Sequence, residues 1–245
     1  MRIEAVRRDL RRRVRAAKGE SGVTLVELLV AITLFTALTI MIISTFSTFT
    51  TTFTKDRIAT DNINIASVGT NELTRVIRSA TSIPRPNLAA DYAPFVEAQA
   101  ETLTIYAYID TDSLTPKPVK IRFSVNTTTR ELVETRWNAV PLSGFPNYWS
   151  FSTTAASSNV IARRIVVPAA GEAPLFNYYK INTTTLKEEL MLVPTTGLIA
   201  ADLEKVAVVE VRVKVQSDNS GRAKPATIIN RVGIPNLGIS RLGPS

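Results

Sequence analysis

The sequence contains no cysteine and no histidine. The absence of cysteine excludes a disulfide framework in whichever compartment the protein folds. Without either residue type, the arrangements in which a histidine activates a serine or cysteine nucleophile are excluded, and so are the usual zinc sites. Carboxylate-only chemistry remains open, but the composition argues against an enzyme, and there is no Gly-rich phosphate loop. We therefore predict no catalytic residues and no cofactor, and the sequence identifies no metal-ligating residues.

Glycine and proline are also absent between residues 23 and 68, and charge is nearly absent from the first half of that stretch. Within residues 23–54, Glu27 is the only charged side chain. The 19 residues 28–46 are uncharged and mostly apolar, which is long enough to span a bilayer as a helix. We predict that residues 23–54 form a transmembrane helix in contact with membrane lipid.

Basic residues are concentrated before this apolar segment. Residues 1–22 hold eight Arg and Lys against three acidic residues, so they carry +5 of the net charge of +8. The high pI is therefore poor evidence for nucleic-acid binding, and no nucleic-acid partner is expected. The positive-inside rule predicts a cytoplasmic N-terminus, with the chain beyond about residue 50 outside. A cleaved secretory signal fits less well, because its apolar core is about 7–15 residues long and precedes the cleavage site.

Beyond the apolar segment the pattern becomes amphipathic. From Ile58 onward apolar residues recur at roughly helical spacing, with charged residues largely elsewhere. We predict an amphipathic helix over residues 55–84 that packs on the rest of the protein and is stopped by Pro84 and Pro86. The threonine-rich stretch 44–55 is expected to be a softer part of the helix, because threonine is a poor helix former.

After the prolines the apolar period changes to two, which predicts a β-rich globular head over residues 85–245. The expected strands are 102–109, 119–126, 130–137, 159–167, 174–181, 189–193, 206–216 and 226–234. The turn NTTT at 126–129 predicts a hairpin. In 206–216 valines alternate with charged residues such as Glu210, which predicts one buried face and one solvent-exposed face. The predicted class is α+β: a long N-terminal helix followed by a mostly antiparallel β head.

The stretch GVTLVE (residues 22–27), followed by LLVAITLFTALTIMII, closely resembles the type IV prepilin cleavage motif. Proteins of that family have a basic leader ending in Gly, and then an apolar helix with Glu at its fifth position. The resemblance implies that residues 1–22 are a leader removed by prepilin peptidase between Gly22 and Val23. Val23 stands where phenylalanine is commonest, and would become the N-methylated first residue. Thr24, Leu25 and Glu27 would take part in subunit assembly.

The chemistry of Glu27 agrees with this resemblance. A carboxylate within a membrane span costs about 2.5–3.5 kcal/mol, so its presence requires a reason. The resemblance implies that it meets the N-terminal amine of a neighbouring subunit, which offsets that cost and fixes the register between subunits. Leu25, Leu28, Leu29 and Ile32 would supply the packing face. The alternative is that Glu27 reaches the membrane interface as part of a plain signal anchor.

The head carries a second resemblance, to the larger minor pilins and the J-class pseudopilins of type II secretion. The segments that carry it are 71–83, 119–137, 174–181, 202–215 and 231–238. This implies a structural and assembly subunit of a type IV pilus or pseudopilus, with other pilin subunits and an assembly platform as partners. It implies residence in the cytoplasmic membrane, N-terminus inside and head outside, and then in the fibre. The alternative is a signal-anchored exported β domain that acts as a ligand- or DNA-binding module.

Three further groups of residues are candidate sites. Asp110 and Asp112 begin a pattern seen in calcium loops, but the Gly and distal Glu of an EF-hand are missing, so a solvated turn is favoured. The aromatic residues in 145–151 could form a contact patch, but a loop folded over the sheet core is favoured. Four cations could touch nucleic acid, but ordinary surface positions are favoured. These are Arg163, Arg164, Lys180 and Lys187.

Overall fold

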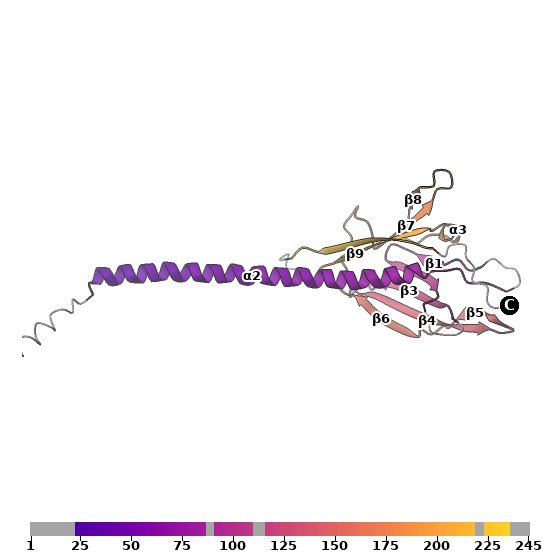
Figure 1. The fold of residues 1–245 in the computed structure, drawn as a ribbon, viewed down its shortest axis with the longest axis horizontal. Coiled ribbons are helices and arrows are strands. Elements are labelled where there is room, and N and C mark those ends of the chain that lie inside the picture. The colour runs from indigo at the N-terminus through magenta and orange to yellow at the C-terminus, as the bar shows by residue number, and fades with distance from the viewer. Residues whose placement is uncertain (1–22, 87–90, 110–115, 219–222, 236–245) are drawn as a thin grey trace, which may run out of the picture. The chain divides into compact units, whose positions relative to one another are not determined.

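The computed structural model describes residues 23–86, 91–109, 116–218 and 223–235. The chain divides into two compact units, Met1–Thr54 and Lys55–Ser245. A single long helix, α2 (Leu25–Arg78), begins in the first unit and ends in the second, where antiparallel strands follow it (Figure 1). The fold is α+β, with one long N-terminal helix followed by antiparallel β-sheets, as the sequence predicts.

The threonine-rich stretch of α2 is continuous helix. Its hydroxyl groups donate hydrogen bonds to the carbonyl oxygens four residues earlier in the chain. Thr48 bonds to the oxygen of Ser44 at 3.0 Å, and Thr51 to that of Ser47 at 2.8 Å. Thr33 and Thr36 do the same within the more apolar part. Since each of these hydroxyls is paired within the helix, threonine does not leave an unpaired polar group on an apolar surface.

The predicted end of the helix near residue 84 is wrong, because α2 ends at Arg78. The chain then runs alongside the sheet: the Thr81 N–H donates to the carbonyl oxygen of Tyr106 at 3.0 Å, and Ala80 forms a bridge with Ala107. Two causes combine here. Pro84 disfavours helical conformation in the residue before it, and the backbone groups of residues 80–83 find partners in extended conformation instead.

One sheet has six strands, all paired antiparallel in the order β1-β2-β3-β4-β5, with β6 also on β4. They are β1 (Phe95–Ala98), β2 (Thr102–Ala107), β3 (Val119–Val125), β4 (Leu132–Leu142), β5 (Phe145–Phe151) and β6 (Ser157–Ala162).

The hairpin predicted at residues 126–129 is confirmed and joins β3 to β4. The loop predicted at 145–151 is wrong. Because β4 extends beyond the end of β3, its last residues pair with β5 instead.

The second sheet has four strands in the order β10-β9-β7-β8, again antiparallel. They are β7 (Phe176–Ile181), β8 (Glu188–Met191), β9 (Val208–Val215) and β10 (Ala226–Gly233), and a short helix, α3 (Ala200–Leu203), precedes β9. The strand β9 has the predicted buried face, on which Val209, Val211, Val213 and Val215 are all inaccessible to solvent.

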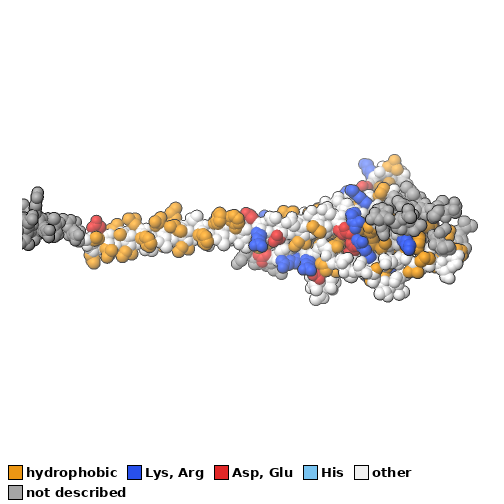
Figure 2. Space-filling view, turned by 60° about the horizontal axis from the view of Figure 1, so that its bottom comes forward, with side chains coloured by type: hydrophobic (Ala, Val, Ile, Leu, Met, Phe, Trp, Pro, Cys, Tyr) orange, Lys and Arg blue, Asp and Glu red, His pale blue; other side chains and the backbone are white. Residues whose placement is uncertain are grey.

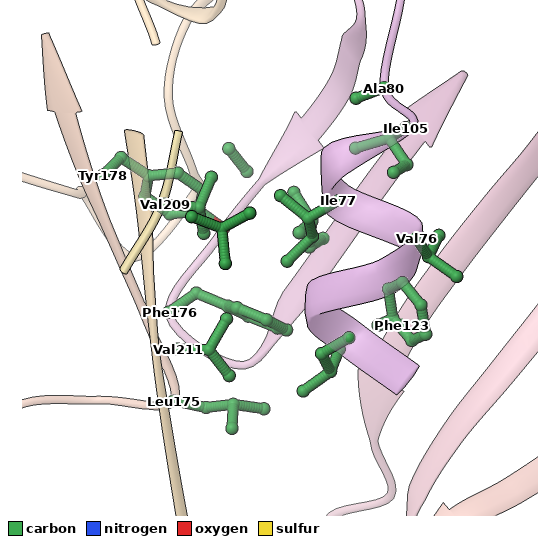
Figure 3. Close-up of a cluster of buried hydrophobic side chains, with 14 of the residues drawn as sticks. Val76, Ile77, Ala80, Ile105, Phe123, Leu175, Phe176, Tyr178, Val209 and Val211 are labelled. Carbon is green, nitrogen blue, oxygen red and sulfur yellow. The ribbon is translucent and has the colours of Figure 1, made fainter. Parts of the chain in front are cut away.

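Side chains of α2 and of both sheets meet in one core (Figure 3). Val76 and Ile77 of α2, Phe123 of β3, and Phe176 and Val211 of the second sheet are all fully buried. Each such side chain contributes about 1.5–3 kcal/mol relative to its exposed state. Along this part of α2, Val68 is 62% exposed, whereas the neighbouring Gly69 is buried.

Gly69 allows α2 to approach β6 closely. A Cβ atom on this residue would lie 2.9 Å from the Cβ atom of Ala162 and 3.7 Å from the carbonyl oxygen of Ile161. Real Cβ atoms are almost never as close as 2.9 Å, so any larger residue would force the helix and strand apart.

We predict that Gly69→Leu destabilises the protein by about 1–3 kcal/mol, because overpacking outweighs the gain of about 1 kcal/mol in helix propensity. The measurement is thermal unfolding of the full chain in detergent micelles, followed by circular dichroism. Val68→Leu, at the exposed neighbouring position, is the control and should leave the midpoint nearly unchanged. A higher melting temperature for Gly69→Leu would show that close approach to β6 is not a constraint.

Candidate functional site

The residues of the predicted assembly site lie at the start of α2. Thr24 precedes the helix, and its Oγ1 accepts a hydrogen bond from the backbone N–H of Glu27 at 3.2 Å. This is a helix N-cap, and Thr24 with Glu27 three residues later has the spacing of a capping box. Glu27 lies in the first turn, where the helix dipole favours a negative charge. The sequence analysis missed the cap, although the T-x-x-E spacing predicts it.

The structure does not place every residue of the predicted site. Gly22 and the leader lie outside the described residues. Val23 and Leu25 are 70% and 80% exposed, and Glu27 is exposed as well. Within the described residues, the Glu27 carboxylate has no hydrogen-bond or ion-pair partner. The structure thus brings Thr24 and the Glu27 backbone together and leaves the carboxylate available.

The described part of the first unit presents apolar side chains to its surroundings. Leu28, Leu29 and Ile32 are 53%, 63% and 58% exposed, and the same holds for the apolar residues as far as Phe53. Figure 2 shows hydrophobic side chains following this helix, with most charged side chains over the second unit. The helix is long and apolar enough to cross a membrane. An apolar surface of this extent requires lipid or other apolar helices around it.

In the second unit, side-chain amides connect α2 to the second sheet. Asn62 is fully buried, its Oδ1 accepts from the Ser217 N–H at 2.8 Å, and its Nδ2 donates to the carbonyl oxygen of Lys224 at 3.4 Å. Further along, Asn230 Nδ2 donates to Thr74 Oγ1 at 2.9 Å. Asn62 was not predicted as a functional residue. Its only signal in the sequence is that an amide stands among the apolar residues of the helix. These bonds fix the helix against the strands at both ends of the contact.

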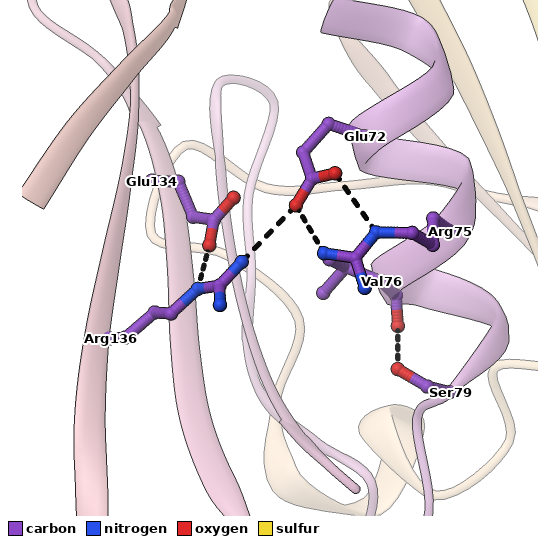
Figure 4. Close-up of polar contacts among 6 residues, drawn as sticks. All are labelled: Glu72, Arg75, Val76, Ser79, Glu134 and Arg136. Carbon is purple, nitrogen blue, oxygen red and sulfur yellow. Dashed lines mark hydrogen bonds and ion pairs between the residues drawn. The ribbon is translucent and has the colours of Figure 1, made fainter. Parts of the chain in front are cut away.

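A four-residue ion cluster joins α2 to β4 (Figure 4). Arg75 Nη2 lies 2.6 Å and Arg136 Nη2 lies 3.2 Å from Glu72 Oε1, and Arg136 also pairs with Glu134. The hydrogen bond from Arg75 lowers the pKa of Glu72. Burial raises the pKa of Glu134, whose residue is 2% exposed. Two carboxylates thus share two guanidinium groups, and the helix and the sheet are linked through Arg136.

Glu210 was predicted on the exposed face of β9, and this is wrong, because it is 6% exposed. Arg231 Nε donates to it at 2.8 Å, the Tyr179 hydroxyl at 3.2 Å and Asn177 Nδ2 at 3.3 Å. Burial alone raises the pKa of Glu210, but these hydrogen bonds outweigh burial and lower it. The strand pattern could not show this burial, because it depends on side chains of β7 and β10.

The remaining predicted candidates are dispersed. Asp110 and Asp112 lie outside the described residues. The aromatic residues in 145–151 form part of a strand, and Phe151 stacks on Tyr106 at 4.7 Å between ring centroids. No group of three or more acidic residues with metal-binding geometry occurs in the part of the chain that the structure describes.

Of the four basic residues considered for nucleic-acid contact, three form ion pairs or hydrogen bonds within the chain. Arg163 pairs with Glu131 at 3.4 Å, and Lys180 with Glu189 at 3.5 Å. Arg164 Nη1 donates to the carbonyl oxygen of Ser217 at 2.7 Å. These contacts favour ordinary surface positions for the cations.

No family model matches this chain, and no curated protein matches it either.

We predict that Glu210→Gln destabilises the protein by about 1–2 kcal/mol at pH 7, because charge-assisted hydrogen bonds to a nearly buried carboxylate are replaced by neutral ones. The pKa of Glu210 is lowered from its ordinary value of 4.5. Its contribution is therefore complete above pH 4.5 and is lost as the pH falls through the lowered pKa.

Urea unfolding of the full chain in micelles, at pH 7 and at decreasing pH below 4.5, provides the measurement. The difference between wild type and Glu210→Gln should shrink as the pH falls. Glu189→Gln, whose side chain is half exposed, is the matched control and should change little at any pH. A difference that stays constant with pH would contradict this role for the carboxylate.

Proposed function

We propose that this protein is a minor pilin or pseudopilin, a structural and assembly subunit of a type IV pilus or a type II secretion pseudopilus. The observation that carries the proposal is the position of the GVTLVE motif: its last three residues form the first turn of a 54-residue helix. The first part of that helix is apolar and exposed, and its second part enters the core of a β-rich unit.

In this proposal the chain resides in the cytoplasmic membrane before assembly, with its N-terminus inside and its β-rich unit outside. Prepilin peptidase cuts between Gly22 and Val23, and Val23 is N-methylated. Cleavage leaves a new amine one residue before the N-cap, Thr24. That end of a helix disfavours a positive charge. The Glu27 carboxylate has no partner among the described residues, so it offers a favourable position for the amine of a neighbouring subunit.

Assembly would then transfer the apolar helix from lipid into a bundle of helices from several subunits. The side chains from Leu25 to Phe53 are available for such packing, since all the large apolar ones among them are at least half exposed. The hydroxyl-to-carbonyl bonds within the helix also suit a bundle core, because they pair every threonine hydroxyl from Thr33 to Thr54. The assembly platform would supply the machinery for this transfer.

A second candidate function has one specific observation in its favour. The Thr24–Glu27 hydrogen bond shows that these residues cap a helix, which a signal-anchored exported module would need as well. In that case the Glu27 carboxylate only reaches the membrane interface, and the β-rich unit binds a ligand or DNA by itself. The two candidates differ in whether the charge of Glu27 is required.

We expect the mature protein to begin at methylated Val23. The measurement is the mass of the N-terminal peptide of the full chain purified from membranes, with and without prepilin peptidase in the cell. Gly22→Val should block cleavage, because a side chain obstructs close approach of the protease to the backbone. Ser21→Ala, immediately outside the motif, should be processed normally. An intact leader in peptidase-positive cells would falsify the proposal.

We also expect Glu27→Gln to be processed but to fail in assembly. Glutamine retains the capping-box pattern and removes the charge, so it separates the two candidates. The fraction of the protein recovered in sheared fibres, relative to the membrane fraction, should fall at least tenfold, and Glu20→Gln is the control. If Glu27→Gln enters fibres as the wild type does, an intersubunit charge pair is not what Glu27 provides.

A further inference from the structure

A polar groove runs beside the part of α2 that begins the second unit. Its volume is about 640 Å³. Among the described residues, three parts of the chain line it: α2, the residues that follow β6 and the residues that follow β9. The charged and amide side chains along it are those of Asp61, Asn64, Arg163, Arg164 and Asp218. Both signs of charge therefore line one hollow.

The two arginines and Asp61 do not neutralise one another. Asp61 is exposed, and within the described residues its carboxylate has no ion pair and no hydrogen bond. Arg164 Nη1 donates to the carbonyl oxygen of Ser217 at 2.7 Å. Arg163 lies 3.4 Å from Glu131, but its side chain remains 70% exposed. The groove thus leaves N–H donors and a carboxylate available to a ligand that carries charges of both signs.

The chemistry of these groups indicates which ligand fits. Guanidinium groups bind phosphate oxygens, often through two parallel N–H donors. A carboxylate accepts hydrogen bonds from an ammonium group. Phosphoethanolamine, in which two carbons join a phosphate to a primary ammonium, supplies both partners. This group is the headgroup of the phospholipid phosphatidylethanolamine.

The groove lies close, along the chain, to the end of the apolar part of α2. The 30 helical residues 25–54 extend about 45 Å at about 1.5 Å per residue, and a bilayer with its headgroups is about 40–45 Å thick. Asp61 follows Thr54 by about 10 Å along the same helix. Long arginine side chains can extend toward the headgroups from such a position. Phospholipid is therefore the ligand that membrane insertion of α2 brings to this groove.

Arg57 adds a cation on the side of α2 that faces the groove. It precedes Asp61 by four residues, so the two share one face of the helix, and Arg57 is one turn nearer to the apolar segment. Residues at this spacing often pair, but no ion pair joins these two, and the Arg57 side chain is without a partner among the described residues. It is the first groove-side cation that a lipid phosphate would meet.

We propose that this groove binds the headgroup of phosphatidylethanolamine from the leaflet next to the second unit. Arg163 and Arg164 hold the phosphate, Asp61 holds the ammonium group, and the acyl chains stay in the bilayer. The bound lipid keeps the second unit at the membrane surface. This inference rests on membrane insertion, which both candidate functions require, and not on entry into a fibre.

The test measures lipid binding to the full chain in detergent micelles by native mass spectrometry. The readout is the fraction of the protein that retains one lipid as the lipid concentration rises. Three phospholipids with the same acyl chains are compared: phosphatidylethanolamine, phosphatidylglycerol, which has no ammonium group, and phosphatidylcholine, whose methylated ammonium cannot donate a hydrogen bond. We expect phosphatidylethanolamine to bind at least tenfold more tightly than the other two. Free phosphoethanolamine should compete only weakly, because it lacks the acyl chains that keep a lipid beside the groove.

Two charge variants examine the two ends of the headgroup. Arg163→Gln should weaken binding of phosphatidylethanolamine at least tenfold, because a phosphate contact is lost. Its matched control is Arg122→Gln, since Arg122 is also a partly exposed arginine near one carboxylate, at 3.6 Å. Asp61→Asn should abolish the preference for phosphatidylethanolamine over phosphatidylglycerol. Asp56→Asn, five residues earlier and on another side of the helix, should retain that preference.

A third variant fills the groove and leaves its charge unchanged. Asn64 is exposed and lines the groove, so Asn64→Trp should weaken binding of phosphatidylethanolamine at least tenfold. The proposal is overturned if the three phospholipids bind equally, if phosphatidylglycerol binds most tightly, or if Asp61→Asn retains the preference. It is also overturned if Arg163→Gln and Asn64→Trp both bind lipid like the wild type.

Equally tight binding of free phosphoethanolamine would overturn the proposal as well, because the ligand would then be a soluble zwitterion and not a membrane lipid. None of these outcomes bears on cleavage after Gly22. Failure of this proposal is therefore distinguishable from failure of the proposed function.

Discussion

The rest of the structure depends on the burial of one face of the second half of α2 between two β-sheets. Leu73, Val76 and Ile77 are completely buried, and at Gly69 the helix lies too close to β6 for any side chain. Tertiary packing of this kind, more than helix propensity, is what stabilises a helix in a protein. The first half of α2 has no such packing, and its apolar side chains remain exposed. One continuous helix therefore has two different requirements for its environment.

The polar contacts around this core refine the position of the helix. Asn62 satisfies both sides of its amide with backbone groups near β9 and β10, while Arg136 of β4 reaches Glu72 on the helix. A buried polar group costs stability unless it is paired, so these contacts specify one arrangement of helix and sheets among those that the apolar residues alone would allow. The cluster around Glu210 acts in the same way within the second sheet.

The features that the sequence predicts correctly are those that a short segment of the chain determines by itself. The α+β class, the long helix and the hairpin at residues 126–129 are confirmed, because apolar periodicity and turn chemistry are properties of short segments. The wrong predictions each involve a distant partner. Residues 80–83 leave the helix to pair with the sheet, and residues 145–151 become a strand because β4 is long enough to pair with them. The burial of Glu210 depends on Arg231, 21 residues away in the chain.

The candidate site shows the same division. The T-x-x-E spacing of Thr24 and Glu27 is a local signal and predicts the observed cap, whereas the buried position of Asn62 depends on backbone groups more than 150 residues away in the chain. The cap also bears on what Glu27 is for. It uses the Thr24 hydroxyl and the Glu27 backbone N–H, and it does not use the carboxylate. Capping therefore accounts for the threonine and leaves the charge unexplained.

A carboxylate beside a long apolar segment is unfavourable unless something outside the described chain pairs with it. The helix dipole offsets only part of that cost, about 0.3–1 kcal/mol at an exposed position. The remainder is the physical reason to look for a partner of Glu27 outside the described residues.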